Sequence, residues 1–500
     1  MSVHPDTHTR EAESPLRLLA DQAFSRAAGA PLVAGNRVRL LRDAGENYPA
    51  WLDAINSAKR HVHFESYIIH EDREGHRFAD ALIAKAREGV HVRVLYDWLG
   101  AVGKTSRRFW QRLREAGVEV RCFNPPSLAS PFGWITRDHR KMLTADGEVG
   151  FVTGLCVGEM WVGNRAQGRE PWRDTGVEIR GVAVADLEAA FARIWKETGE
   201  ALPADAVSDR DALASAGDVS LRVIAGEPST GGLYRLDKLI AVGARARLWL
   251  TDAYFVGTTS YVQALVAAAR DGVDVRLLVP GSSDIPLVRA VSRAGYRPLL
   301  EGGVRVFEWN GSMVHAKTAV ADGHWARVGS TNLNLASWMT NWELDVAIED
   351  DGFAREMEEM YLQDLEHSTE IILNERKRVL LSGYPERRIR SAQVKISEGS
   401  AGRVIAGTVG VGNAIGAAIT NHRTLGAAEA KVMASGGVLL LVAAVVGILF
   451  PRVITVPLSL IGVWVAVALL VRAYRLHVET RLRTATQPEQ VSAERTTAHK

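Results

Sequence analysis

Hydrophobic and polar positions follow two periods along most of the chain, and together these periods predict an α/β fold. Short apolar runs alternate with amphipathic stretches of ten or so residues, several of which end at a glycine. Strands that alternate with helices of this length predict mixed, largely parallel sheets covered by helices. In the first part of the chain the predicted helices are 48–58, 77–88 and 107–116, and the predicted strands are 61–69, 90–96 and 118–123.

The same order of elements returns after a polar stretch around 203–218. The segments 91–97 (HVRVLYD) and 274–280 (DVRLLVP) occupy equivalent places in the two series. The chain is therefore predicted to be an internal duplication at the scale of whole domains, spanning 37–205 and 218–365, after an N-terminal tail and helix at 1–36. The second series has predicted helices at 233–243, 262–270 and 286–294, and predicted strands at 246–255, 273–279 and 304–308.

Length and composition narrow the class of protein. Five hundred residues exceed what one compact core holds, so two or more domains are expected. The net charge of only +2 argues against binding nucleic acid through overall charge. The two cysteines, Cys122 and Cys156, lack CxxC spacing, which favours a reducing compartment over a disulfide framework or a zinc site. The first fifteen residues lack the apolar core of a signal peptide.

The C-terminal part changes character. A basic and Gly/Ala-rich segment at 366–430 precedes two arms without charged residues, 432–450 and 453–471. A helix of either length spans about 28 Å, close to the roughly 30 Å hydrocarbon core of a bilayer. We expect a transmembrane hairpin at 431–472 followed by a basic tail at 473–500. Basic residues on both flanks predict that the α/β body faces the cytoplasm.

Alternatives remain at this end of the chain. A buried core helix would explain one apolar arm but not two consecutive ones. The stretch 401–430 fits a linker, a loosely packed helix pair or a segment on the membrane surface.

The candidate chemistry lies in a motif of the form His-x-Lys-x4-Asp that occurs once in each half. Each copy is followed at the same offset by a small-residue turn, at 153–156 and at 329–332, which makes chance a poor explanation. Two imidazoles and two ammonium groups without a second set of metal ligands suggest metal-free phosphodiester chemistry. The lysines would neutralise charge, one histidine would attack phosphorus and the other would transfer a proton. The six residues are His139, Lys141, Asp146, His315, Lys317 and Asp322.

Because each half supplies one histidine and one lysine, the site is expected at the seam between the halves, near a pseudo-twofold axis. The two imidazoles would titrate as a coupled pair, one neutral and one cationic near neutral pH. Asp146 and Asp322 are expected to brace their own loops. Asp174 and Glu343 each open a strand after the turns, where they suit a partner for the second nitrogen of a histidine ring. A surface carboxylate at a strand start is the alternative for each.

The paired motifs, with the Gly-Ser-Thr-Asn turn at 329–332, resemble the phospholipase D superfamily. Four further segments resemble its bacterial cardiolipin synthase branch, and the resemblance covers roughly 38–365. It implies a two-step phosphatidyl transfer without metal or cofactor: one phosphatidylglycerol donates its phosphatidyl group to the enzyme, glycerol leaves, and a second phosphatidylglycerol accepts. It also implies a bacterial inner membrane location. The four segments are 65–67, 96–100, 123–126 and 172–175.

The resemblance also implies roles for single residues. His139 would be the nucleophile and His315 the general acid. The turn 153–156 departs from the family pattern because Cys156 stands where an asparagine is usual, and the apolar hairpin is C-terminal, where many relatives have an N-terminal one. Beside His139, Lys141, His315 and Lys317, the phosphate site would include Asn332 and Ser330, with Asp174 and Glu343 behind the histidines.

Several functions use the same residues and stay open at this point. Phosphatidylethanolamine is an alternative lipid partner. A lipid hydrolase with water as the acceptor, a nucleic-acid phosphodiesterase and a catalytically silent membrane scaffold are the alternatives to a transferase. No nucleic-acid partner is expected, because the basic cluster adjoins the apolar arms and not the motifs.

Overall fold

The computed structural model describes residues 15–126, 135–284, 291–373 and 379–381, with single positions between 441 and 474. By contacts it divides into two units. One comprises Met1–Phe123 and Thr136–Glu429, and the other comprises Asn124–Ile135 and Ala430–Lys500, of which few residues are described. The expected hairpin at 431–472 lies almost entirely outside the described residues. Among those that are described, no helix is both long enough and apolar enough to cross a membrane.

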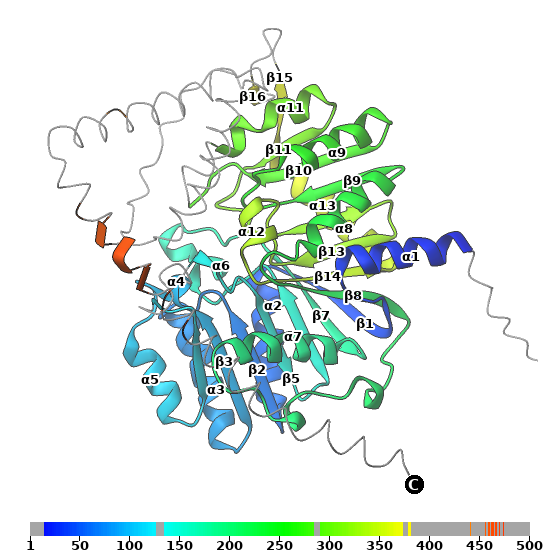
Figure 1. Ribbon diagram of the computed structural model, residues 1–500. Coiled ribbons are helices and arrows are strands. Elements are labelled where there is room, and N and C mark those ends of the chain that lie inside the picture. The colour runs from blue at the N-terminus through cyan, green and yellow to red at the C-terminus, as the bar shows by residue number, and fades with distance from the viewer. Residues whose placement is uncertain are drawn as a thin grey trace, which may run out of the picture. The chain divides into compact units, whose positions relative to one another are not determined.

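The first half of the α/β unit contains seven strands (Figure 1). Several of its helices begin at a residue whose side chain caps the first turn or end at a glycine. Asp72 caps the helix that follows it by accepting the N–H of Gly75 at 3.0 Å, and Gly89 and Gly117 end two helices with φ of 90° and 94°, a conformation that suits glycine. The elements are α1 (Pro15–Ala28), β1 (Val33–Arg42), α2 (Asp43–Ser57), β2 (His61–Ser66), α3 (Arg73–Arg87), β3 (His91–Asp97), α4 (Trp98–Ala101), α5 (Arg107–Glu115), β4 (Glu119–Phe123), β5 (Lys141–Ala145), β6 (Val149–Thr153), α6 (Glu159–Val162), β7 (Thr175–Gly181) and α7 (Val184–Glu197).

The second half repeats this order and adds two strands at its end. The predicted helix at 286–294 falls largely outside the described residues. The elements are β8 (Val219–Gly226), α8 (Gly232–Gly243), β9 (Arg247–Thr251), α9 (Thr259–Arg270), β10 (Asp274–Pro280), α11 (Tyr296–Glu301), β11 (Arg305–Trp309), β12 (Thr318–Ala321), β13 (Trp325–Gly329), α12 (Leu335–Met339), β14 (Glu343–Glu349), α13 (Asp351–Glu366), β15 (Ser368–Leu373) and β16 (Val379–Leu381).

All these strands form one 16-stranded sheet. The strand order β1-β7-β6-β5-β2-β3-β4 recurs as β8-β14-β13-β12-β9-β10-β11, and the antiparallel pair β1 and β8 joins the two series. The expected duplication is therefore visible in the topology, but as one continuous sheet.

The sheet is mixed, as expected, but the expectation that it is largely parallel is wrong. Among the described strands, parallel pairing is confined to β2-β3-β4 and β9-β10-β11, which are the strands connected by helices. The strands around each motif, β5-β6-β7 and β12-β13-β14, pair antiparallel. The connections β5–β6 and β12–β13 are tight turns, too short for a parallel crossover, so these neighbouring strands run in opposite directions.

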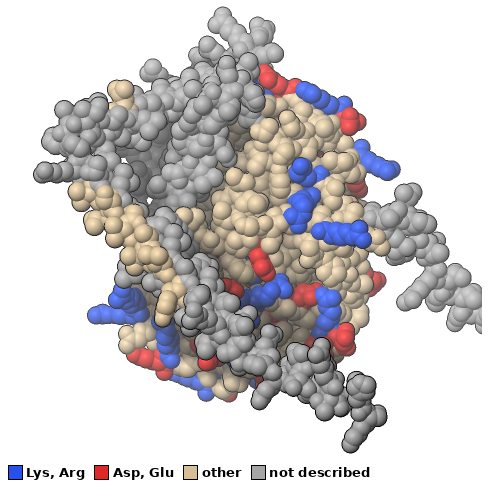
Figure 2. Space-filling view, viewed as in Figure 1, with Lys and Arg blue, Asp and Glu red and all other residues tan. Residues whose placement is uncertain are grey.

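Three hydrophobic clusters cover the sheet. One packs α2, α3 and α5 of the first half against β2 and β3, and another packs α1, α8, α9 and α11 against the second half. The third contains residues of α7 and α13 together with strands from both halves, so this apolar core is shared between them. Figure 2 shows Lys and Arg side chains and Asp and Glu side chains distributed over one face of the molecule.

Candidate active site

Backbone hydrogen bonds join each histidine segment to the opposite half of the chain. The N–H of His139 donates to the carbonyl of Trp342 at 2.9 Å, and the N–H of His315 donates to the carbonyl of Arg173 at 2.7 Å. Trp342 directly precedes Glu343, and Arg173 directly precedes Asp174. The two equivalent contacts therefore bring each histidine beside the strand start of the other half, as expected for a site at the seam.

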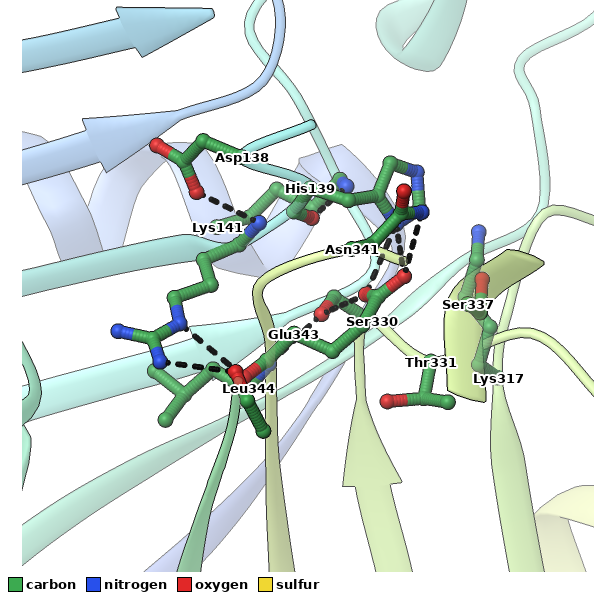
Figure 3. Close-up of polar contacts among 12 residues, drawn as sticks. Asp138, His139, Lys141, Lys317, Ser330, Thr331, Ser337, Asn341, Glu343 and Leu344 are labelled. Carbon is green, nitrogen blue, oxygen red and sulfur yellow. Dashed lines mark hydrogen bonds and ion pairs between the residues drawn. The ribbon is translucent and has the colours of Figure 1, made fainter. Parts of the chain in front are cut away.

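Each imidazole is held by a carboxylate from the other half. Nδ1 of His139 lies 3.0 and 2.9 Å from the two oxygens of Glu343. Nδ1 of His315 lies 2.8 Å from Oδ2 of Asp174. Because Nδ1–H donates to the carboxylate, each neutral ring carries its lone pair on Nε2. Figure 3 shows His139, Ser330 and Asn341 converging on Glu343.

The lysines lie close to the histidine of their own motif. Nζ of Lys317 is 2.9 Å from Nδ1 and 3.0 Å from Nε2 of His315. Nζ of Lys141 donates to the carbonyl of His139 and lies 5.3 Å from the ring centre of Tyr67. Lys317 also lowers the pKa of His139, and Lys141 lowers that of His315, so both cations act on both rings. The two pairs thus belong to one site.

Burial sets the protonation of these groups. It lowers the pKa of His139 to about 4 and, with the help of Lys317, that of His315 to about 3, although the carboxylates act in the opposite direction. Burial also lowers the pKa of Lys317 to about 8. Both rings are therefore neutral at pH 7, which differs from the expected neutral and cationic pair. The reason is that burial and two ammonium groups disfavour a further positive charge.

The carboxylates remain ionised. Burial alone would raise the pKa of Asp174 and of Glu343, but the adjacent histidine and lysine outweigh it, and the pKa of each is lowered. The site therefore contains two carboxylates and two lysine side chains around two neutral imidazoles. One anionic group can bind beside the lysines together with a proton on one of the neutral imidazoles.

The aspartates of the two motifs lie apart from the histidines, in tight turns between strands. Asp146 and Asp322 have φ of 56° and 53°, each is followed by a glycine with positive φ, and each turn closes a hairpin. Asp146 accepts three backbone N–H groups at 2.7 to 2.8 Å, and Asp322 accepts three at 2.8 to 2.9 Å. These contacts brace the two turns, as expected for Asp146 and Asp322 from the sequence.

Ser330 makes a different contact from the predicted one. Its hydroxyl donates to Oε2 of Glu343 at 2.6 Å and accepts the N–H of Leu344 at 2.9 Å, so it positions the carboxylate and is not free to bind phosphate. Asn332 is buried, and its side-chain oxygen has no hydrogen-bond partner in the part of the chain that the structure describes. Asn332 thus remains a candidate for binding phosphate with the two lysines.

One group of described side chains comes close enough to be considered as metal ligands. The ligand atoms of His61, His63 and Glu188 lie within 4.8 Å of one another. However, Nε2 of His61 already pairs with Glu188 at 2.7 Å, and the guanidinium of Arg93 lies 3.5 Å from His63. A buried hydrogen-bonded cluster explains these contacts without an ion. The cluster lies at the start of strand β2. The other end of β2, at Ser66, pairs with Lys141 of the site.

Comparison with known proteins decides the family. A family model described as "Cardiolipin synthase, PLD-like domain" matches residues 51–195 and 240–365. The chain is 35% identical to cardiolipin synthase of Alkalihalophilus pseudofirmus over 349 residues, which is 68% of this chain and 68% of that protein. The chain belongs to the cardiolipin synthase family of phospholipase D-like proteins.

Two further comparisons agree with this assignment. The chain is 34% identical over 360 residues to cardiolipin synthase A of Pseudomonas aeruginosa, covering 72% of this chain and 73% of that one. The crystal structure of phosphatidylserine synthase from Haemophilus influenzae superposes with a TM-score of 0.56 at 15% identity, covering 72% of this chain and 91% of that chain. At this identity the likeness shows the fold alone.

In this member of the cardiolipin synthase family, Cys156 ends the first-half turn, at the position equivalent to Asn332 in the second half. The residue is buried, and burial raises the pKa of its thiol, so it carries no charge. Gly154 in the same turn lies against Asp174, since a Cβ placed there would be 2.2 Å from Oδ1. In the second half the equivalent position is Ser330, which hydrogen-bonds to Glu343. The two turns therefore hold their carboxylates in different ways.

Sequence reasoning missed the side chains that enclose the two rings of this cardiolipin synthase-like site. Tyr67 contacts His139 edge-on at 5.0 Å between ring centres, and Tyr254 contacts His315 at 5.9 Å. Trp161 and Trp172 also lie within 6 Å of the His315 ring centre. The sequence carries two signals for them: Tyr67 and Tyr254 occupy equivalent places in the repeat, and Tyr67 and Trp172 lie in the segments 65–67 and 172–175 that resemble the cardiolipin synthase branch. Trp161 has neither signal.

Proposed function

We propose that this chain is a membrane-bound cardiolipin synthase that converts two molecules of phosphatidylglycerol into cardiolipin and glycerol. The observation that carries the proposal is the crossed arrangement of the site, in which each half lends a histidine and a lysine and holds the histidine of the other half. Such a site matches a phosphodiester, whose single negative charge the two lysines neutralise. Family membership supports a phosphatidyltransferase over the other phosphodiester chemistries.

In the first step one ring acts as the nucleophile. Nε2 of His139 bonds to phosphorus, the bond between phosphorus and the glycerol headgroup oxygen breaks, and His315 gives its proton to the departing alkoxide. Both rings are neutral before substrate binds. The anionic phosphodiester favours the imidazolium form, so His315 takes up its proton as the lipid enters.

In the second step the acceptor is a hydroxyl group of another phosphatidylglycerol and not a water molecule. Neutral His315 removes the hydroxyl proton, the lipid oxygen bonds to phosphorus, and the bond between phosphorus and His139 breaks. Glu343 stabilises the His139 ring in the tautomer that attacks, and Lys141, Lys317 and Asn332 hold the phosphate oxygens throughout.

The location follows from sequence features outside the described residues. The apolar arms at 432–450 and 453–471 would anchor the enzyme in the inner membrane of a bacterium, and the basic flanks would keep the α/β unit on the cytoplasmic side. Basic residues at 376–395 would lie against anionic headgroups, at about 1 kcal/mol for each favourable contact.

The experiment is to incubate the full-length protein in detergent micelles with phosphatidylglycerol alone and to identify the products. Glycerol and a four-chain lipid in equal amounts are expected. Phosphatidic acid as the main product would show a hydrolase, and a four-chain lipid formed only when phosphatidylethanolamine is added would change the partner. The variants H139N and H315N should both be inactive, whereas H91N, which changes an exposed histidine of β3, serves as the matched control. Full turnover by either of the first two variants would overturn the proposal.

A further inference from the structure

The carboxylate that holds each catalytic ring is itself held by a neutral side chain with no role in the reaction. Nε1–H of Trp161 donates to Oδ2 of Asp174 at 3.1 Å, the same oxygen that lies 2.8 Å from Nδ1 of His315. Nδ2–H of Asn341 donates to Oε1 of Glu343 at 3.1 Å. Each donor thus shares its acceptor atom with a histidine ring.

We propose that Trp161 and Asn341 are positioning residues that tune the two histidines separately, Trp161 acting on His315 through Asp174 and Asn341 acting on His139 through Glu343. The roles in phosphatidyl transfer rest on the proposed function. A hydrogen bond to a carboxylate oxygen withdraws negative charge from it, so the oxygen is a weaker acceptor for Nδ1–H and stabilises the imidazolium less. Each donor also fixes the orientation of the carboxylate, and through it the direction of the ring.

The two halves achieve this in different ways. The indole of Trp161 is buried and contacts the rings of Trp172 and His315, at 5.2 and 5.7 Å between centres, so it has little freedom to move. Asn341 is half-buried and lies between α12 and β14, where water can replace its amide. Each carboxylate retains one further donor, the hydroxyl of Ser330 at 2.6 Å on Glu343 and the backbone N–H of Thr175 at 2.9 Å on Asp174, so the difference between the two pairs lies in the burial of Trp161 and Asn341. Loss of the Trp161 N–H is therefore predicted to change the properties of His315 more than loss of the Asn341 amide changes those of His139.

Other charged groups reach the two rings equally in every variant. Those that act on His315 are Asp174, Lys317 and Lys141, and those that act on His139 are Glu343, Lys141 and Lys317. None of them is changed by substitution of Trp161 or Asn341. A difference between the variants therefore reports the hydrogen bond to the carboxylate.

The test uses the full-length protein in micelles and two variants that remove one donor each, Trp161→Phe and Asn341→Leu. The first readout needs no lipid substrate: the low-field Nδ1–H proton signals of the two rings at neutral pH, assigned by their loss in H139N and H315N. Trp161→Phe should move only the His315 signal downfield, and Asn341→Leu only the His139 signal, because each carboxylate becomes a stronger acceptor. Trp172→Phe is the matched control, since Trp172 contacts the His315 ring at 5.5 Å and the structure shows no hydrogen bond from it to Asp174.

The second readout is the pH dependence of kcat with phosphatidylglycerol. One limb of the profile should move upward by about one pH unit in Trp161→Phe, and the other limb by about half a unit in Asn341→Leu. The limb that moves in Trp161→Phe identifies the step in which His315 titrates. If Trp161→Phe does not fold, β-(3-benzothienyl)alanine at position 161 keeps the shape of the indole and removes only its N–H.

The outcomes separate the two proposals. Signals that stay in place in both variants, or that move together in both, would overturn the positioning roles even if cardiolipin forms normally. Signals that move as expected in a protein that makes no cardiolipin would uphold the positioning roles and overturn the proposed function.

Discussion

Nδ1 of His139 lies 2.9 Å from Oε2 of Glu343, although 204 residues separate the two in the chain. The reciprocal pair, His315 and Asp174, is 2.8 Å apart and crosses the seam in the other direction. Neither half can therefore hold its own histidine. This crossing gives a physical reason for the duplication, since a single copy would have an imidazole without the carboxylate that fixes its tautomer.

The first prediction is that Glu343→Gln lowers kcat by about 10²- to 10⁴-fold while the protein stays folded. The amide no longer stabilises an imidazolium, and its N–H₂ group favours the wrong tautomer of His139. Asp174→Asn should act similarly on His315. Initial rates of glycerol release from phosphatidylglycerol micelles measure the effect.

Glu356→Gln is the control for this prediction, because Glu356 lies on α13 and its charged neighbours are Arg42, Glu46 and Glu359, away from either ring. Rates within twofold of the unmodified protein for Glu343→Gln and Asp174→Asn would show that the crossed pairs are not part of catalysis.

Much of the site could be predicted from sequence because its residues repeat. His139 and His315, with their lysines, stand at fixed offsets in the two halves, and a fixed offset in a duplicated fold means equivalent positions. The carboxylates could be found in the same way. The crossing could not, because sequence spacing does not tell which half of a symmetric pair a side chain reaches.

The sequence predicts the outer strands of the sheet, which alternate with helices, but not the antiparallel strands at its centre. Strands β2, β3 and β4 are separated by helices, and the hydrophobic period reveals both. Strands β5 and β6 are joined by a tight turn at Asp146 and Gly147, but in the sequence this Asp-Gly hairpin signal coincides with the end of the His-x-Lys-x4-Asp motif. The tuning residue Trp161 lies in the four-residue helix α6, and Asn341 lies in the connection between α12 and β14. Both segments are too short for a hydrophobic period to mark them.

The second prediction concerns Gly154. A methyl group at this position would lie 2.2 Å from Oδ1 of Asp174, which is fully buried and cannot move away freely. Gly154→Ala should therefore displace Asp174 from His315 and lower kcat by roughly tenfold or more, in the manner of a small misplacement in a preorganised site. Gly103→Ala controls for the loss of a glycine, since a Cβ there meets nothing within 4 Å, although its φ of 67° is strained. Unchanged kcat in Gly154→Ala would show that Asp174 has room to adjust.

The third prediction separates stability from chemistry at Asp146. Burial opposes its ionisation, but the N–H groups of His61, Lys59 and Arg60 outweigh burial and lower its pKa. A lowered folded-state pKa contributes stability above the unfolded value of 3.8, and this contribution is lost as the pH falls through the folded value. Asp146→Asn should lower the free energy of unfolding by about 1 to 3 kcal/mol at pH 7.

The loss in Asp146→Asn should shrink only as the pH falls below 3.8 and through the lowered folded-state pKa, because both proteins then carry a neutral side chain at this position. Denaturant unfolding at pH 7 and at a pH below that folded-state pKa measures the difference. The kcat at 20 °C should stay within about threefold of the unmodified protein, since the turn does not touch substrate. A large fall in kcat with unchanged stability would instead place Asp146 in the reaction.

The last prediction concerns the ammonium group of Lys317. Burial lowers its pKa to about 8, against the opposing effect of Asp174. Above this pH the free enzyme loses one of the two charges that neutralise the phosphodiester, so kcat/KM for phosphatidylglycerol should fall by about tenfold per pH unit from pH 8 to pH 10. The pH profile of kcat/KM reports the free enzyme, which makes it the proper measurement. Lys317→Arg should lower the maximum but remove this alkaline fall, because a guanidinium stays protonated throughout the range. An identical alkaline fall in Lys317→Arg would assign it to another group and leave Lys317 charged at the working pH.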